Sequence, residues 1–127
     1  MKVADSADID ACLTAKKLLP LQAAQLVIPG ETQVAGLGFS FAFVPEAAEN
    51  NGSIAVERSH AEAEAIADRF VKSEVKRISK LGLKVTEQTL RNGLWVENNS
   101  IVVWNGDPGV TPPGRDVAKR TLATCLT

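Results

Sequence analysis

The sequence predicts an α+β fold in which an antiparallel sheet of about five strands packs against one long central helix, at about residues 60–81, with a helix at each terminus. Apolar residues recur with helical spacing from residue 60 to residue 81, whereas bulky and small or polar residues alternate on either side of that segment. Short turn sequences separate the alternating runs, and strands joined by short turns pair antiparallel.

The length of 127 residues fits one domain, so we expect a single globular unit over residues 1–127. A hydrophobic fraction of 45% and a charged fraction of 23% are ordinary for globular proteins. The net charge of −1 gives no reason to expect a nucleic-acid partner. No apolar run approaches the roughly 18 residues of a membrane helix. We therefore expect neither nucleic acid nor membrane among its partners.

The two cysteines, Cys12 and Cys125, lie near opposite ends of the chain. Two isolated thiols make neither a disulfide framework nor a C-x-x-C metal or redox motif. Two free thiols are therefore expected in preference to a bridge that ties the termini together. The first residues show no basic region followed by an apolar stretch, so no secretory signal is expected. Together these expectations favour a cytoplasmic protein.

The first helix is expected at about residues 9–19. Ser6 or Asp8 can cap its start, and Pro20 stops it because proline does not continue a helix. Residues 21–28 follow, and they fit a helix and a strand equally well because so short a run has no decisive period. Both alternatives remain open for that segment.

The clearest strand covers residues 33–44, and its two faces differ because side chains alternate across a strand. One face is bulky. The other face is almost bare, and it holds Gly36, Gly38, Ser40 and Ala42. Glycine weakens a strand unless something approaches its backbone closely. A helix of the same chain on the bare face is the main interpretation, and a homodimer contact or a bound ligand is the alternative.

A second strand is expected at residues 53–58, followed by the long helix. Ser59 and Glu62 match the capping box that starts a helix, and Gly82 is placed to end it in the left-handed conformation. Phe70 lies near the centre of one apolar stripe at about 3.6 residues per turn. The stripe consists of Ala63, Ile66, Ala67, Phe70, Val71, Ile78 and Leu81.

Three further strands are expected at residues 83–90, 94–97 and 100–104, because the apolar period there changes to two. Favoured tight-turn sequences separate them. These turns are Asn92-Gly93 and Asn98-Asn99. Residues 106–114 are rich in glycine and proline and predict a loop, and a last helix is expected at about 115–126.

This order of elements resembles that of small secretion chaperones, which are dimeric α+β proteins. No motif residues carry the likeness, and the composition is less acidic than is usual for that family. No family is therefore assigned from it.

Glu74 is the most informative charged residue, because it falls inside the apolar stripe of the long helix. A buried carboxylate needs a partner, and Arg77 lies three residues further along the same helix. A structural Glu74–Arg77 pair is the main expectation. The alternatives are a polar floor to a ligand pocket and a catalytic carboxylate. His60, the only histidine, is expected to be an exposed residue of the first helical turn.

Trp95 and Trp104 lie on neighbouring predicted strands. The simpler interpretation is that they anchor the sheet to its helix. Alternatively, they line a small-ligand pocket together with Glu74 and Arg77.

The function favoured by the sequence is that of a small intracellular, non-catalytic protein-binding or adaptor module that acts as a homodimer. Its partner is then a second copy or another protein. No metal-ligand spacing and no cofactor fingerprint is present in the sequence, so neither a metal nor a cofactor is expected. A ligand-binding protein with a pocket between sheet and helix is the alternative, and a minor enzyme that uses Glu74 or His60 is the second.

Overall fold

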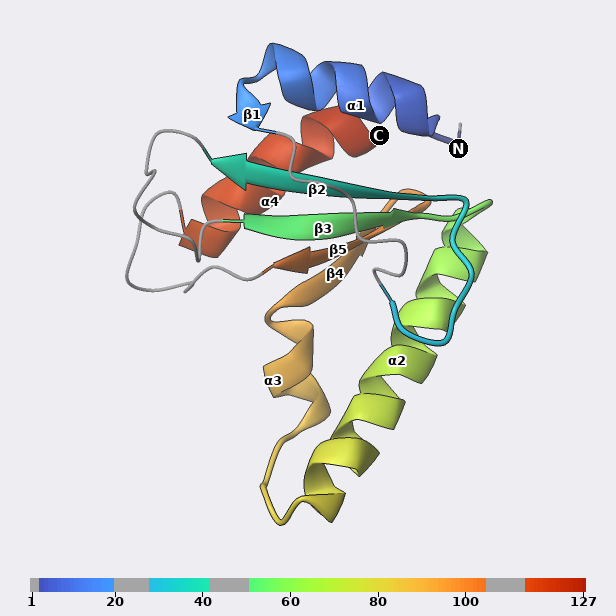
Figure 1. Ribbon diagram of the computed structural model, residues 1–127, viewed down its shortest axis with the longest axis vertical. Coiled ribbons are helices and arrows are strands. Elements are labelled where there is room, and N and C mark those ends of the chain that lie inside the picture. The colour runs from blue at the N-terminus through green and yellow to red at the C-terminus, as the bar shows by residue number, and fades with distance from the viewer. Residues whose placement is uncertain (1–2, 20–27, 42–50, 105–113) are drawn as a thin grey trace.

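The computed structural model describes residues 3–19, 28–41, 51–104 and 114–127. One antiparallel sheet carries helices on both of its faces (Figure 1). The helices are α1 (Ser6–Ala15), α2 (His60–Lys80), α3 (Glu87–Arg91) and α4 (Gly114–Leu126). The strands are β1 (Leu18–Leu19), β2 (Ala35–Phe41), β3 (Asn51–Val56), β4 (Leu94–Glu97) and β5 (Ser100–Trp104).

The sheet has the order β1-β2-β3-β5-β4, and each neighbouring pair is antiparallel. Four strands make up its body, and β1 adds only two residues beside β2. The predicted α+β class, the long helix and the helix at each terminus are confirmed. Of the five strands predicted, four are present, as β2, β3, β4 and β5.

The strand predicted at residues 83–90 is wrong. Residues 83–86 are irregular, and α3 follows them. Thr86 caps this short helix, because its side chain accepts a hydrogen bond from Thr89 N at 3.2 Å. The α3 part of the segment contacts α2, and no residue of the segment pairs with a strand that the structure describes. Asn92 and Gly93 consequently end α3 and do not form a hairpin turn.

The two end signals of α2 are confirmed. The Ser59 hydroxyl accepts a hydrogen bond from Glu62 N at 3.1 Å. At the other end, Gly82 has a φ of +81°, which is the conformation that favours glycine. Gly82 N donates to Ser79 O at 3.1 Å and Leu83 N donates to Ile78 O at 3.4 Å. This pair of bonds is a Schellman motif, so the helix has a defined stop.

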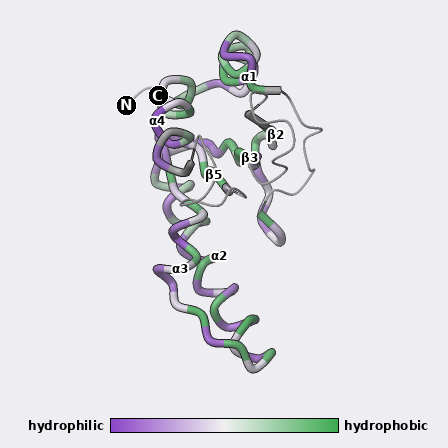
Figure 2. The backbone as a smooth tube through the Cα atoms, turned by 90° about the vertical axis from the view of Figure 1, so that its left-hand side faces the viewer, coloured by the Kyte–Doolittle hydropathy of each residue, from purple (hydrophilic) through white to green (hydrophobic). Residues whose placement is uncertain are grey.

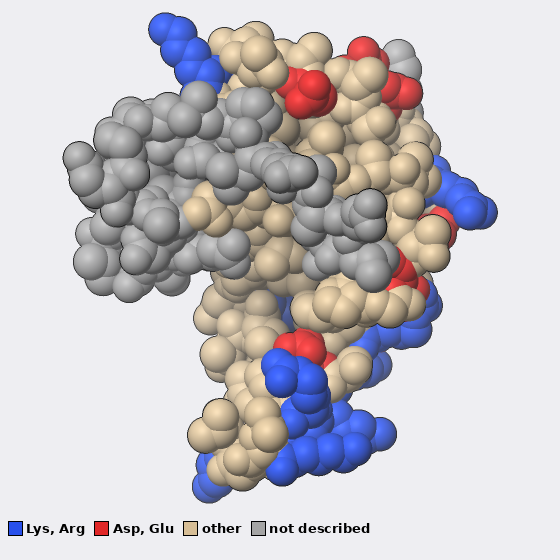
Figure 3. All heavy atoms as spheres, in the orientation of Figure 1, with Lys and Arg blue, Asp and Glu red and all other residues tan. Residues whose placement is uncertain are grey.

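Only the first half of α2 packs on the sheet. Ala67 and Val71 are fully buried, whereas Phe70 and Ile78 are half-buried and Leu81 is 65% exposed. The second half of α2 runs past the sheet, and α3 lies beside it (Figures 1 and 2). Lys and Arg side chains gather at the end of this α2–α3 arm (Figure 3). Phe70, near the centre of the stripe, is half-buried against the α2 core, because the stripe extends further than the part of the sheet that it covers.

Two apolar cores lie on the two faces of the sheet. The α1/α4 core lies between the sheet and the two terminal helices, and the α2 core lies between the sheet and α2. Consecutive residues of a strand point into different cores. The side chain of Ile54 lies in the α1/α4 core, and that of Ala55 lies in the α2 core. The side chains of the α1/α4 core include Ile9, Leu13, Phe39, Val102, Leu122 and Leu126. Those of the α2 core include Ile28, Ala63, Ile66, Val71, Leu94 and Ile101.

α1 begins three residues earlier than predicted and is capped by Asp5, whose carboxylate accepts a hydrogen bond from Ala7 N at 2.8 Å. It ends at Ala15, and Leu18 belongs to β1. Of the ambiguous segment 21–28, only Ile28 is described, and it is buried in the α2 core. The predicted loop 106–114 lies outside the described residues except for the first residue of α4.

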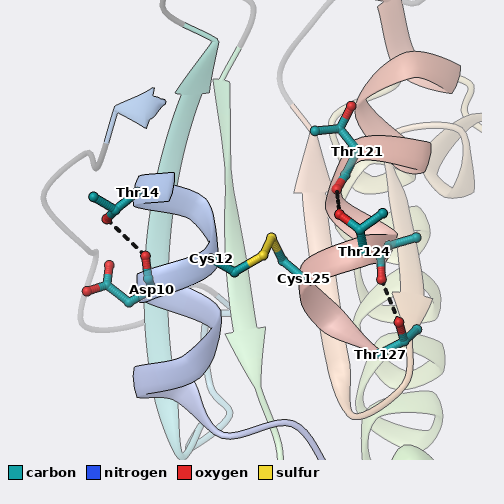
Figure 4. The surroundings of a disulfide bond; sticks show 8 residues. Asp10, Cys12, Thr14, Thr121, Thr124, Cys125 and Thr127 are labelled. Carbon is teal, nitrogen blue, oxygen red and sulfur yellow. Dashed lines mark hydrogen bonds between the residues drawn. A yellow bond between two sulfur atoms is a disulfide. The ribbon is translucent and has the colours of Figure 1, made fainter. Parts of the chain in front are cut away.

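A disulfide joins Cys12 on α1 to Cys125 on α4, with a Cα–Cα distance of 5.6 Å (Figure 4). The prediction of two free thiols is therefore wrong. The two residues are 113 positions apart in the chain, yet α1 and α4 pack side by side on the same face of the sheet. Spacing along the sequence says nothing about such a long-range neighbour.

The bare face of β2 is only partly accounted for. Gly36 and Gly38 are half-buried, Ala42 lies outside the described residues, and the side chain of Ser40 is not described. α2 packs mainly against β4 and β5, which lie at the opposite end of the strand order from β2. The predicted homodimer contact on this face stays a prediction.

Candidate functional site

Glu74 and Arg77 form the ion pair that their spacing predicts. Nε of Arg77 donates to one carboxylate oxygen of Glu74 at 2.9 Å, and Nη2 donates to the other at 2.9 Å. The hydrogen bonds and the charge of Arg77 lower the pKa of Glu74. The pair lies on the part of α2 that projects beyond the sheet, and its two hydrogen bonds satisfy both carboxylate oxygens of the half-buried Glu74.

Trp95 and Trp104 lie in the α1/α4 core and are 7% and 5% exposed. The ring of Trp104 stacks on Phe39, and Nζ of Lys119 lies 5.8 Å from the ring centroid of Trp95. Both tryptophans thus face away from α2. The structure brings Glu74 and Arg77 together on α2 and places both tryptophans in the core on the other face of the sheet; a ligand pocket shared by the four residues stays a prediction.

His60 occupies the exposed first turn of α2, as predicted. Its Nδ1 lies 2.6 Å from the backbone oxygen of Asn98, in the turn between β4 and β5. Its Nε2 lies 3.4 Å from the carboxylate of Glu64, one turn along α2. These contacts hold the start of α2 against the hairpin. Within the described ranges, no group of three or more His, Cys, Asp or Glu is placed to hold a metal ion.

Glu57 is a buried acid that the sequence analysis did not single out. It follows β3, it is 1% exposed, and its Oε2 has no hydrogen-bond partner among the described residues. Burial raises the pKa of Glu57 from 4.5 to about 7; the charges of Glu62 and Glu31 add to the rise, and that of Arg58 opposes it. Residues two positions apart in a strand point to the same face. The buried Ala55 would therefore have predicted that the side chain of Glu57 is also buried.

The outer edge of β4 is a candidate binding surface, because some of its backbone groups are not bonded within the sheet. β4 lies at one end of the sheet, with β5 on its inner side. Gly93 O accepts a hydrogen bond from Trp104 N at 2.8 Å, and every second residue from Gly93 then bonds to β5. The N–H and C=O groups of Leu94 and Val96 therefore point away from the sheet. Among the strands that the structure describes, none lies beyond them.

Two shallow hollows run along this edge. The first has a volume of about 240 Å³, and it opens between α2, α3 and β4. The second, of about 310 Å³, lies between the end of β4 and α4. Lys119 lines both hollows. The first is lined by Glu64, Ala67, Arg91, Leu94, Trp95, Val96 and Lys119, and the second by Glu97, Asp116, Lys119, Arg120 and Ala123.

The edge is held firmly in place from both faces. Leu94 is 5% exposed in the α2 core, and Trp95 is buried in the α1/α4 core. A strand anchored on both faces presents its free backbone groups in a fixed geometry. Charge differs along the edge, because Arg91 precedes β4 and Glu97 ends it. We call this surface, from Arg91 to Glu97 with Lys119 beside it, the β4 edge.

None of the helices that the structure describes combines the length and the apolar character of a membrane span. No protein-family model matches the chain, and no curated protein and no solved structure is significantly similar to it.

Proposed function

We propose that the protein is a non-catalytic protein-binding module that acts as a homodimer, and that two copies pair through the β4 edge. The observation that carries the proposal is the outward direction of the backbone groups of Leu94 and Val96, beyond which no described strand lies. Unpaired strand edges bind further strands through main-chain hydrogen bonds. The strand of another protein would use the same groups, so the edge also suits a protein partner.

A two-fold axis placed beside Trp95 would let the β4 edges of two identical copies pair. Antiparallel pairing places Leu94 of one copy opposite Val96 of the second, and each hydrogen bond is repeated by symmetry. The same arrangement brings the Glu97 end of one strand beside the Arg91 end of the other. Arg91 already forms ion pairs with Asp68 and Glu87 of its own chain, so the main-chain hydrogen bonds, and not the charges at the two ends, carry the proposed pairing.

The oligomeric state tests this proposal. Sedimentation at tens of micromolar is expected to show a species of twice 13.5 kDa. Val96→Pro removes an outward N–H that no described residue bonds, so the monomer should fold while the dimer is lost. Val85→Pro, in the irregular segment before α3, is the matched control and should leave the dimer intact.

A wild-type protein that sediments only as a 13.5 kDa species contradicts the dimer. A dimer that survives Val96→Pro contradicts the assigned edge. In that case Gly38→Leu tests the bare face of β2, and loss of the dimer in a folded Gly38→Leu protein would locate the contact there instead.

The disulfide also bears on the compartment. Stable disulfides are formed and kept in oxidising compartments and are rare in the cytosol. The Cys12–Cys125 bond therefore supports an oxidising compartment in place of the cytoplasmic location expected from the sequence. Alkylation of thiols in protein taken directly from its native cells should leave both cysteines unmodified. Alkylation of both would support the cytoplasmic location.

A further inference from the structure

The end of the α2–α3 arm exposes two leucines. Leu81 is 65% exposed and Leu83 is 62% exposed, which makes them the most exposed large hydrophobic side chains of the described residues. They flank Gly82, at the turn that closes α2, and this turn lies far from the sheet (Figures 1 and 2). Adjacent exposed leucines at a projecting turn mark an interaction site more often than scattered ones do.

Lysines surround these leucines. Residues 72–86 contain five Lys or Arg and one Asp or Glu, a local net charge of +4 in a chain of net charge −1. Lys76, Lys80 and Lys84 are exposed, and none of them forms an ion pair with any carboxylate that the structure describes. Figure 3 shows the resulting cationic surface at the end of the arm. We call Lys76, Lys80, Leu81, Leu83 and Lys84 the basic tip.

The helix dipole explains only part of this surface. Cations in the last turn of a helix are stabilising, which gives Lys80 a structural reason to lie near the end of α2. Lys84 lies beyond the helix, and the dipole does not account for it. The Schellman motif needs the left-handed glycine but does not require that Leu81 and Leu83 face solvent.

We propose that the basic tip docks on an anionic lipid surface. Leucines that enter the headgroup boundary and lysines that neutralise anionic headgroups are the two components of peripheral membrane binding. The tip lies at the end of the projecting arm, where a broad flat partner can reach it (Figures 1 and 2). The hollow of about 560 Å³ beside Leu83 and Lys84 is open and not an enclosed pocket. A membrane partner is not expected from the sequence, because no apolar run is long enough to span a membrane; peripheral docking needs no such run and follows from the local charge and the two exposed leucines.

Other polyanions fit the tip less well. Single-stranded nucleic acids are bound by aromatic side chains on which bases stack, and the basic tip has none. Leu81 and Leu83 would contribute nothing to a purely electrostatic contact. The leucines therefore provide the means to distinguish a lipid surface from any other polyanion.

Vesicle flotation tests the inference. The purified protein is mixed with phosphatidylcholine vesicles that contain either no anionic lipid or about 30% phosphatidylserine, at about 0.15 M salt. Flotation is expected only with the anionic vesicles, and the affinity should fall at least about tenfold when the salt is raised to about 0.5 M. Failure to float with anionic vesicles, or equal flotation with both kinds, would overturn the proposal.

Matched double variants locate the contact. Lys80→Glu/Lys84→Glu reverses two charges of the tip and should weaken vesicle binding at least about tenfold. Lys16→Glu/Lys17→Glu makes the same charge change after α1, at exposed positions, and should leave binding unchanged. Equal losses in the two variants would overturn the assignment to the tip. Circular dichroism checks that each variant is folded.

A third variant separates lipid from other polyanions. Leu81→Ser/Leu83→Ser keeps every charge and replaces only exposed side chains. It should weaken vesicle binding about tenfold while retention on a heparin column stays the same. Unchanged vesicle binding would show that the tip binds anions of any kind and would overturn the lipid assignment. None of these results depends on whether the β4 edge forms a dimer, because sedimentation measures that separately.

Discussion

The rings of Phe39 and Trp104 stack on each other across Gly52, with centroids 6.1 Å apart and planes 11° apart. The three residues are in register on adjacent strands, with Gly52 on β3 between the other two. A Cβ atom on Gly52 would lie 2.8 Å from the Phe39 ring and would also collide with the Val103 carbonyl oxygen. The glycine therefore makes room for two aromatic rings in the middle of the sheet.

Gly52→Ala should destabilise the protein by about 1 to 3 kcal/mol, because the new methyl group overpacks this stack. Urea unfolding measures the loss. Gly93→Ala is the control, since its Cβ would have ordinary contacts, the nearest at 3.4 Å. Equal stability of wild type and Gly52→Ala would show that the rings do not lie as described.

Reduction of the disulfide should lower the free energy of unfolding by about 2 to 5 kcal/mol, because the Cys12–Cys125 bond closes a loop of most of the chain. The measurement compares urea midpoints with and without reductant, and Cys12→Ser/Cys125→Ser should match the reduced protein. Identical midpoints in both conditions would mean that the bond contributes nothing or is absent.

Two isoleucines of α2 should differ in their contribution to stability. Ile66 is 2% exposed in the α2 core, so Ile66→Ala should cost about 2 to 5 kcal/mol. Ile78 is half-buried on the projecting arm, and Ile78→Ala should cost less than about 1 kcal/mol. Urea unfolding of both variants measures the two losses in the free energy of unfolding. Similar losses would mean that the arm packs as tightly as the first half of the helix.

Glu57 should make stability depend on pH. Its folded pKa of about 7 lies above its ordinary value of 4.5, so the folded state holds the proton more tightly than the unfolded chain does. The favourable contribution of the protonated group is complete below pH 4.5 and is lost as the pH rises through 7. Relative to Glu57→Gln, the wild type should lose about 1 to 3 kcal/mol between about pH 4.5 and 8.

Urea midpoints of both proteins across this pH range measure the difference. Because the glutamine side chain of the Glu57→Gln variant does not titrate, all other ionisable groups cancel in the comparison. A difference that stays constant with pH would place Glu57 in contact with solvent.

Features of the structure that depend only on residues close together in the chain could be predicted from the sequence. Ser59 and Glu62 start the long helix, Gly82 ends it, and Asn98-Asn99 forms the tight turn between β4 and β5. Each of these features depends on residues within a few positions of one another, so the sequence contains the complete signal.

Features with long-range causes could not be predicted. Cys12 meets Cys125 only because α1 and α4 share one face of the sheet. Period-two alternation at residues 83–90 does not reveal that these residues pair with none of the strands that the structure describes. For the same reason, the sequence of β4 gives its side-chain alternation but not the strand order that leaves one of its sides open.

Amide hydrogen exchange at Leu94 and Val96 tests the proposed β4 edge most directly. At concentrations where the dimer forms, both amides should exchange at least about tenfold more slowly than in dilute protein. The amides of Trp95 and Glu97 bond to β5 and should be protected at every concentration. If Leu94 and Val96 exchange rapidly at all concentrations, the β4 edge is not the interface and the account of the protein as an edge-paired homodimer is wrong.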